Sequence, residues 1–441
     1  MPVRALRPRD DEHGKSMEAL RPANDSTPPE QSGGPPHPSQ RSQRGLDWFI
    51  FFVADVQTGF GPFIAVYLTS QKWTQVDIGL VLSIGGIVSL IAQIPGGLLV
   101  DAARSERLVA GVALVVIATS AAAYALMPVF PVVLSAAVMH ALASCVLGPC
   151  IVAISLGLVG HAGIGARLGR NARFASIGNG IAAAAMGACG YFFSPRAVFV
   201  VTAAMLIPSL VALYYVRPGE IDPVLAHGGA PLRKIPKKTP VRFSKILRKP
   251  GLLILAGCVM LFHLANAAML PLMGSVLTMR SAEWATVLIG ACIVVPQLVV
   301  AALSPWVGRH AQTWGRRPLV LIAFASLPVR GLLFASVTDP TLLVAVQVLD
   351  GITAACLGVM IPLMVADLTR GTGRFNFAQG VVGTAMGIGA SISPTLGGVL
   401  TDGYSSSVAF LGLAGVAAFG FLAVWMFLPE TRPHDDAAGS H

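Results

Sequence analysis

The stretch GLLVDAARSER, residues 97–107, recurs in a weaker form as GRHAQTWGRR, residues 308–317. The two copies begin 211 positions apart, and the same shift pairs Ala54 with Ala265 without a gap. Each copy follows a long apolar segment and ends in arginine. An internal repeat of this length predicts a chain built from two similar halves.

The composition indicates a membrane protein. Of the 441 residues, 54% are hydrophobic and only 12% are charged, a balance too apolar for a soluble chain of this size. Windows of roughly 20 apolar residues, the length that crosses a bilayer as a helix, can be drawn six times in each half. These windows are 47–69, 76–100, 107–127, 131–159, 172–193, 196–216, 251–278, 284–307, 318–337, 340–368, 375–401 and 407–428.

The windows predict an all-α membrane protein with twelve transmembrane helices in two pseudo-symmetric six-helix halves. The segments outside them are polar. Pro, Ser, Arg and Asp are frequent in the first 45 residues, which we expect to be disordered. The predicted domains are a cytoplasmic tail at 1–45, a bundle at 46–216, a basic cytoplasmic linker at 217–250, a bundle at 251–430 and a cytoplasmic tail at 431–441.

The net charge is +10, and the basic residues lie mostly on one side of the predicted membrane topology. On one side, 19 Lys and Arg residues lie in or next to the loops, whereas the other side holds only Lys72, Arg196 and Arg280. By the positive-inside rule, both termini are predicted to be cytoplasmic in a multi-pass protein of the inner (plasma) membrane, with the first helix as its own insertion signal. A nucleic-acid partner is therefore not expected. The six cysteines all fall in predicted spans, which favours packing over disulfide or zinc chemistry.

The first copy of the repeat resembles the hallmark of the major facilitator superfamily, G-x-x-x-D-R-x-G-R-R in the loop after helix 2. It keeps Gly97, Asp101 and Arg107, while Ala102 replaces the first arginine and Arg104 the second glycine. The resemblance implies the twelve-helix facilitator fold, and it is nearest to the drug and metabolite:proton antiporter branches.

The second copy matches the weaker hallmark after helix 8. It keeps Gly308, Gly315, Arg316 and Arg317 and has Gln312 at the position of the aspartate. The resemblance implies that the loop after helix 2 meets the start of helix 11, here RFNFAQG from Arg374, and latches the halves together on the cytoplasmic side. The candidate latch residues are Gly97, Asp101, Arg107, Gly308, Gly315, Arg316, Arg317 and Arg374.

In the facilitator fold, helices 1, 4, 7 and 10 line the central cavity, and polar residues lie within these spans here. An intramembrane carboxylate is tolerated when it is protonated, paired or hydrated, and it is usually functional. Asp55 is the first candidate for proton coupling, and Asp350 the candidate for a second proton or for the charge of the substrate. The candidate cavity residues are Asp55, Thr58, His140, Ser144, His263, Asn266, Gln347 and Asp350.

Several family features are absent. The segment AVMHA, 137–141, lacks the arginine that drug exporters carry in helix 4, and helix 5 lacks the antiporter glycine-proline motif. No Arg or Lys lies on the expected cavity faces, so an anionic substrate would have no counter-charge. We expect the deep Arg330, on peripheral helix 9, to snorkel or to pair with Asp339.

These features predict a secondary active transporter of a small neutral or cationic solute, working by alternating access and exporting by proton coupling. It is expected to be a monomer whose partners are its substrate, protons and the lipid bilayer, with no enzymatic activity, cofactor or metal. Three alternatives stay open: a divalent-metal exporter using the Asp and His residues, a proton-coupled uptake symporter, and a non-transporting sensor or scaffold.

Overall fold

A computed structural model describes residues 38–58, 63–229, 242–280 and 285–432. These residues belong to one compact unit, residues 36–441. Residues 1–37, which make up most of the predicted N-terminal tail at 1–45, lie outside the described residues. The described chain contains helices and no strand. The all-α prediction is therefore confirmed for the described chain.

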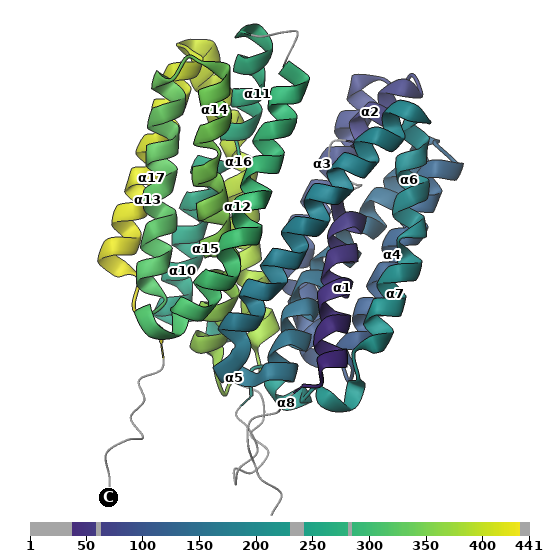
Figure 1. The fold of residues 1–441 in the computed structure, drawn as a ribbon, viewed down its shortest axis with the longest axis vertical. Helices are drawn as coiled ribbons and strands as arrows, with labels where there is room; N and C mark the ends of the chain where they lie inside the picture. Colours follow the sequence, from purple (N-terminus) through teal and green to yellow (C-terminus); the bar gives the residue numbers. More distant parts are fainter. Residues whose placement is uncertain (1–37, 59–62, 230–241, 281–284, 433–441) are drawn as a thin grey trace, which may run out of the picture. The chain divides into compact units, whose positions relative to one another are not determined.

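The first half forms a bundle of helices around its own hydrophobic core. Figure 1 shows these helices, coloured purple to teal, packed against one another. Their core includes Phe49, Leu114, Tyr124, Leu147 and Phe199, each fully buried. The helices are α1 (Gln40–Thr58), α2 (Phe63–Ser70), α3 (Gln75–Ala102), α4 (Glu106–Leu126), α5 (Phe130–Phe192), α6 (Pro195–Ala204) and α7 (Leu206–Tyr215).

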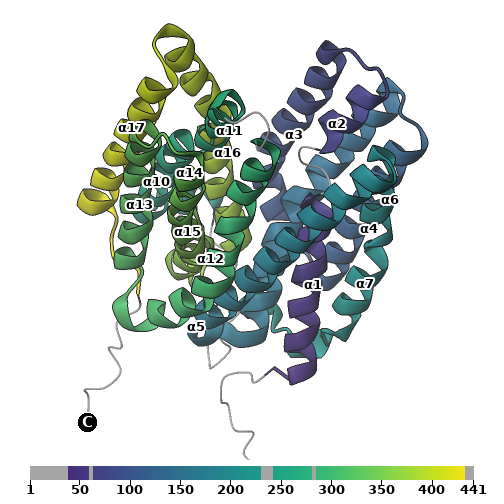
Figure 2. The ribbon, with the colours of Figure 1, turned by 45° about the horizontal axis from the view of Figure 1, so that its top comes forward.

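The second half repeats the arrangement around a second core, and Figure 2 shows its green and yellow helices from a tilted view. Leu156, Ile164 and Leu168 of α5 are buried in this second core, so α5 joins the two bundles. The helices are α10 (Pro250–Asn266), α11 (Met269–Arg280), α12 (Ala285–Trp314), α13 (Arg317–Ser336), α14 (Pro340–Val346), α15 (Val348–Thr369), α16 (Phe375–Gly403) and α17 (Ser406–Phe427).

The chain between predicted spans 4 and 5 is not the polar loop that the windows suggest. Helical structure runs through Phe130–Phe192, and only Gly160 has non-helical angles, with φ 64° and ψ −178°. Residues that carry a side chain essentially never adopt this pair of backbone angles, so a glycine is required at the turn. Arg167 and Arg170 of the following segment, residues 161–171, both form ion pairs with Asp47 of α1.

Nine helices of the described chain are long and apolar enough to cross a membrane. The continuous α5 counts once among them, although two spans are predicted within it. Neither α1 nor α16 is among the nine, because α1 carries Arg41, Arg44 and Asp47 in its first half and α16 is rich in Gly, Ser and Thr. The count of twelve stays a prediction, and helix α1 begins earlier than the predicted boundary at residue 46.

The linker has structure at both ends. It contains η1 (Pro218–Glu220), α8 (Pro223–Ala226) and α9 (Phe243–Leu247). Gly228 has φ 76°, and a Cβ there would lie 2.8 Å from that of Phe375. Its carbonyl accepts a 2.7 Å hydrogen bond from the backbone N–H of Gly371, and the carbonyl of neighbouring His227 accepts one from Phe375. The segment 218–229 therefore connects the first bundle to the start of α16.

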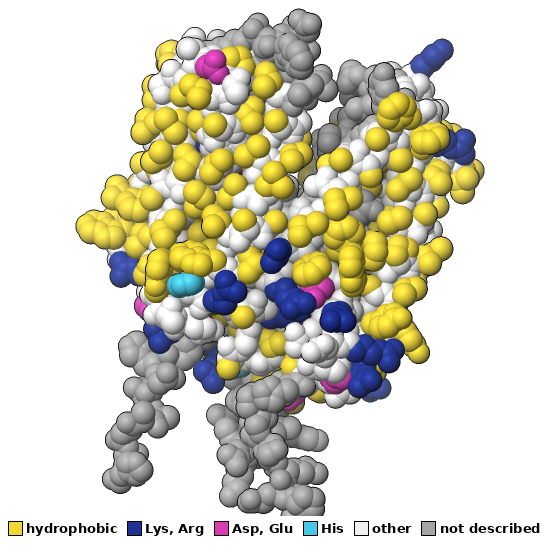
Figure 3. Space-filling model, viewed as in Figure 1, with side chains coloured by type: hydrophobic (Ala, Val, Ile, Leu, Met, Phe, Trp, Pro, Cys, Tyr) yellow, Lys and Arg dark blue, Asp and Glu magenta, His cyan; other side chains and the backbone are white. Residues whose placement is uncertain are grey.

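The outer surface of the bundles is apolar. Large hydrophobic side chains such as Ile91, Leu126, Phe192 and Phe427 are more than half exposed, and Figure 3 shows yellow side chains over most of one face. An exposed apolar surface of this extent requires a lipid environment.

Candidate functional site

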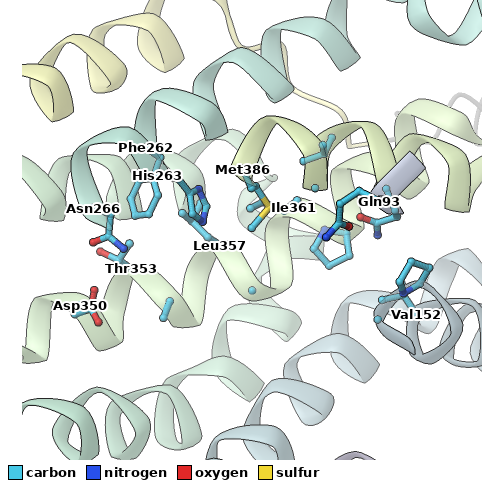
Figure 4. Close-up of a pocket in the computed structure, with 18 residues that line it drawn as sticks. Gln93, Val152, Phe262, His263, Asn266, Asp350, Thr353, Leu357, Ile361 and Met386 are labelled. Carbon is cyan, nitrogen blue, oxygen red and sulfur yellow. The ribbon is translucent and has the colours of Figure 1, made fainter. Parts of the chain in front are cut away.

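A central cavity of about 510 Å³ lies between the bundles. Helices α3 and α5 of the first bundle and α10, α15 and α16 of the second contribute to its wall, as Figure 4 shows. The residues that line it are Gln93, Gly148, Pro149, Val152, Phe262, His263, Asn266, Asp350, Thr353, Ala354, Leu357, Gly358, Ile361, Pro362, Gln379, Val382, Gly383 and Met386.

The polar groups of the cavity are spread along its length, with His263 between the two ends and apolar side chains among them. Asn266, Asp350 and Thr353 lie at one end in Figure 4, and Gln93 lies towards the other. Phe262, Leu357 and Met386 are among the apolar side chains between them. Such a cavity suits a molecule with an apolar body and hydrogen-bonding groups at separated positions.

Arg330 reaches the polar end of the cavity from α13. Its guanidinium is buried, with 3% of the side chain exposed, and it forms an ion pair with Asp350. It also donates to the Asn266 Oδ1 atom. The expected pairing of Arg330 with Asp339 is therefore wrong, because Asp339 instead caps α14 by accepting from Thr341 and Leu342 N–H groups. Arg330 points inwards, where a carboxylate compensates its charge.

His263 has a defined orientation. Its Nδ1 atom lies 2.9 Å from the carbonyl oxygen of Val259. Since a carbonyl only accepts, Nδ1 carries the proton and donates. The Nε2 atom of this cavity-lining ring can then accept a hydrogen bond or bind a second proton.

The other predicted cavity residues are placed differently. His140 and Ser144 of α5 lie 3.3 Å apart, Nε2 to Oγ, and neither is among the lining residues. Gln347, 1% exposed, is buried where α14 meets α15. The side chains of Asp55 and Thr58 lie outside the described part of the structure, although both residues belong to α1.

Two cavity glutamines escaped sequence reasoning. Gln93 lies on α3 and Gln379 on α16, helices that correspond to predicted spans 2 and 11 and not to the four expected to line the cavity. Each interrupts a long apolar run, which is the only sequence signal that marks them. The Gln379 Nε2 atom is buried without a hydrogen-bond partner among described residues, so it is available to a ligand acceptor.

Asp101 makes the contact expected with the start of helix 11. One carboxylate oxygen accepts from the backbone N–H of Asn376 at 3.1 Å and from its Nδ2 at 2.9 Å. The other accepts from the backbone N–H of Phe377 at 2.8 Å. These N–H groups belong to the first turn of α16, where a helix has unpaired donors and favours an anion.

The glycines that begin the two repeat copies occupy equivalent close approaches. A Cβ on Gly97 would lie 2.1 Å from the Asn376 carbonyl oxygen, and a Cβ on Gly308 would lie 2.3 Å from that of Gly165. The contact of α3 with α16 is therefore equivalent to the contact of α12 with α5. Only glycine allows the backbones of the two bundles to come this close.

The remaining residues of the second copy act within their own bundle. Arg316, 1% exposed, pairs with Asp367 at 3.0 Å. Glu430 accepts from the backbone N–H groups of Arg316 and Arg317, so the chain after α17 is attached to the start of α13. Burial opposes ionisation of Glu430, but these amide donors lower its pKa. Gly315, with φ 91°, makes the turn that positions both arginines.

Arg374 and Arg107 are not part of the Asp101 contact. The Arg374 guanidinium lies 4.1 Å from the ring centroid of Phe243, a linker residue. Arg107 lies in the first turn of α4 and forms no ion pair with a described residue. At this end of the bundles, Asp101 makes the charged contact with the start of α16.

A buried charge cluster on the first bundle was also missed from sequence. Asp47 of α1, with 2% of its side chain exposed, pairs with Arg167 at 2.6 Å and with Arg170. Arg167 further donates to Asn171 at 2.7 Å. The cluster attaches α1 to the helical segment after Gly160.

A second missed pair joins the linker to the first bundle. The His227 Nε2 atom lies 3.1 Å from an oxygen of Glu106, a residue that is 3% exposed. The Glu106 carboxylate raises the pKa of His227, although burial opposes the shift, and Asp101 adds to it. Because the folded pKa is raised, this contact stabilises most below the ordinary value of 6.5 and is lost as the pH rises through the folded value.

We therefore expect the segment 218–229 to loosen at alkaline pH. Amide hydrogen exchange of this segment, corrected for the intrinsic rate, should be faster at about pH 8.5 than at about pH 6. His227→Gln should remove most of this difference. Equal protection at both values in the parent protein would show that the pair does not hold the segment.

Comparisons with known proteins agree with this geometry. The family model described as Major Facilitator Superfamily matches residues 48–339 and 255–440. An uncharacterised MFS-type transporter of Mycobacterium tuberculosis is 41% identical over 403 residues, covering 90% of this chain and 95% of the relative. A solved structure, the human organic anion transporter MFSD10, aligns with a TM-score of 0.64 over 87% of this chain and 99% of its own, at 14% identity, and so shows the fold.

Shorter matches include named resistance proteins. The class G tetracycline resistance protein of Vibrio anguillarum is 29% identical over 150 residues, 34% of this chain and 37% of its own. Multidrug resistance protein 1 of Bacillus subtilis is 29% identical over 150 residues, 33% of this chain and 36% of its own. By its family model and its full-length relative, the chain is a multi-pass membrane protein that belongs to the Major Facilitator Superfamily, a family of transporters and not of enzymes.

Proposed function

We propose that the protein is a proton-coupled exporter of a neutral small molecule with an apolar body. The observation that carries the proposal is the cavity shared by both bundles, with hydrogen-bonding groups at separated positions. Alternating access requires a site at the interface of the two repeats, and this cavity meets that requirement. The tetracycline and multidrug resistance relatives support export.

The charge balance of the cavity favours a neutral solute. Asp350 is the ionisable acid among the lining residues, and Arg330 already compensates it. A cationic substrate would have to compete with a buried guanidinium for the same carboxylate. An anion would meet a guanidinium that two acceptors already engage. The cationic alternative expected from sequence therefore has less support than the neutral one.

We assign proton coupling to Asp55. It is the other acid that lies well inside the spans expected to line the cavity, since Asp47 and Asp367 lie at the ends of theirs. A carboxylate there can bind a proton on one side of the membrane and release it on the other. In this proposal the protein acts as a monomer in the inner membrane with both termini in the cytoplasm. Asp101 then closes the cytoplasmic side in the state described here.

Asp55→Asn is expected to abolish accumulation driven by a pH gradient while exchange of the solute continues. The measurement uses proteoliposomes with an imposed pH gradient and labelled tetracycline, the solute that a relative's name provides, followed by a panel of neutral and cationic drugs. Asn cannot bind a proton in this range, so the gradient has no site to act on.

The matched control is Asp402→Asn, which makes the same change at an exposed position at the end of α16. It should accumulate solute as the parent does. Gradient-driven accumulation by Asp55→Asn at the parental rate would refute the coupling role, and failure of the parent to move any solute of the panel would count against export.

A further inference from the structure

A surface hollow lies where α5 of the first bundle meets α12 of the second. Its volume is about 510 Å³, and it is separate from the central cavity. Arg170, Arg173, Phe174 and Ile177 contribute from α5, together with Ala166, and Pro305 and Arg309 contribute from α12. Figure 3 shows dark-blue side chains gathered in the lower part of one face, below a mostly yellow surface.

The hollow carries an excess of positive charge. Arg173 and Arg309 are exposed and form no ion pair with any residue that the structure describes. Arg170 pairs with Asp47, yet 45% of its side chain is exposed. Asp47 is shared with the buried Arg167, so this one carboxylate already compensates two arginines. The exposed guanidiniums therefore lack enough anionic partners within the described chain.

The same hollow has an apolar wall beside its arginines. Phe174, Ile177 and Pro305 line it beside the arginines. Close by on α12, the rings of Trp306 and Trp314 pack edge to face at 5.1 Å, and Trp314 is half exposed. Tryptophan side chains gather at the headgroup level of a bilayer, and arginines near helix ends reach to that level. The charged part of the hollow would then face headgroups, and the apolar part acyl chains.

We propose that this hollow binds an anionic phospholipid of the bilayer, whose phosphate contacts Arg173 and Arg309 while its acyl chain lies along Phe174 and Ile177. The positive charge of the two guanidinium groups favours a lipid with a net negative charge over a zwitterionic one. A phospholipid matches both the charge and the apolar wall, whereas a free anion matches only the charge. The site does not depend on the transport proposal.

Binding at this position joins the two bundles. Behind the hollow, a Cβ on Gly169 would lie 2.4 Å from the Ser304 carbonyl oxygen, so the backbones of α5 and α12 are in close contact. One phosphate shared by Arg173 and Arg309 requires these helices to stay adjacent. The lipid therefore favours the state in which the bundles meet at the Asp101 end.

The test is retention of phosphatidylglycerol by the full-length protein. Protein from nanodiscs of equal parts phosphatidylglycerol and phosphatidylcholine is examined by native mass spectrometry. The parent should retain phosphatidylglycerol in preference to phosphatidylcholine, and Arg173→Gln with Arg309→Gln should weaken this preference about fivefold for each arginine removed. Arg173→Lys with Arg309→Lys should keep most of it, because the charge stays.

The control pair is Arg248→Gln with Arg196→Gln, which removes the same charge from two exposed positions outside the hollow. It should retain the lipid as the parent does. Equal loss in this control, or undiminished retention in the Gln pair, would overturn the proposal. Loss of the preference in the Lys pair would also overturn it. So would a parent protein in pure phosphatidylcholine that inorganic phosphate stabilises to the melting temperature reached with phosphatidylglycerol.

Discussion

Asp101→Ala is expected to separate the two bundles at the latch end. The substitution removes an acceptor that receives three hydrogen bonds from the first turn of α16. Hydrogen bonds to a charged group contribute about 1.5–3 kcal/mol each, but Asp101 is partly exposed and water can replace some of them. A net loss of about 2–3 kcal/mol shifts the equilibrium about 30- to 150-fold away from the closed arrangement.

Distances between spin labels at Arg104 and Arg370 measure this shift. Both positions are exposed, one on each bundle, and the six native cysteines are buried or half-buried. The distribution should move to longer distances in Asp101→Ala. Asp77→Ala is the control, because it removes an acid from the other end of the same helix α3. An unchanged distribution in Asp101→Ala would show that the glycine contacts alone hold this end closed.

The contact between α3 and the start of α16 could be predicted from the sequence because it depends on the spacing of two residues along one helix. The repeat places Gly97 and Gly308 at equivalent positions, and a missing side chain has a direct meaning where two helices must touch. The carboxylate of Asp101 follows one helical turn after Gly97, so a helix that contacts one is within reach of the other. The family resemblance then supplied the partner, the start of α16.

The cavity could be predicted only in part, because a sequence does not give the rotation of each helix about its axis. His263, Asn266 and Asp350 do line it, whereas His140, Ser144 and Gln347 face other neighbours. Arg330 illustrates the difficulty. Its helix is peripheral in the family fold, but a long side chain on the inner face of a peripheral helix can reach a central carboxylate.

The linker and the charge cluster on α1 show a second limit. His227 and Glu106 are 121 positions apart, and Asp47 is separated from Arg167 by 120, so no local pattern relates them. Each contact depends on the three-dimensional path that the chain takes after Gly160 or after α7. Charge counting identified these arginines as a topology signal without indicating that some of them are buried ion-pair partners.

The largest loss in the free energy of unfolding is expected when the ion pair of Arg330 and Asp350 is broken by substituting Asp350. Arg330 is 3% exposed, whereas 30% of the Asp350 side chain is exposed to the cavity. Asp350→Asn leaves a buried guanidinium without an anionic partner, because the amide oxygens of the new asparagine and of Asn266 are neutral, and losing one partner of a buried pair costs about 3–5 kcal/mol. Arg330→Met should cost less, because the exposed carboxylate can take up water or a proton.

The double variant tests whether the two residues act as a pair. With both charges removed, no uncompensated ion remains, so the double variant should unfold with a loss smaller than the sum of the single losses by about 1–3 kcal/mol. Denaturant titration in mixed micelles gives the three free energies of unfolding, and Asp339→Asn, which keeps a capping side chain on α14, is the control. Additive losses would contradict the pairing. They would also support the role of Asp350 expected from the sequence, that of an unpaired carboxylate available to a proton or a cationic substrate. If Arg330 does compensate the charge of Asp350, this acid should influence the free energy of unfolding more than substrate selectivity.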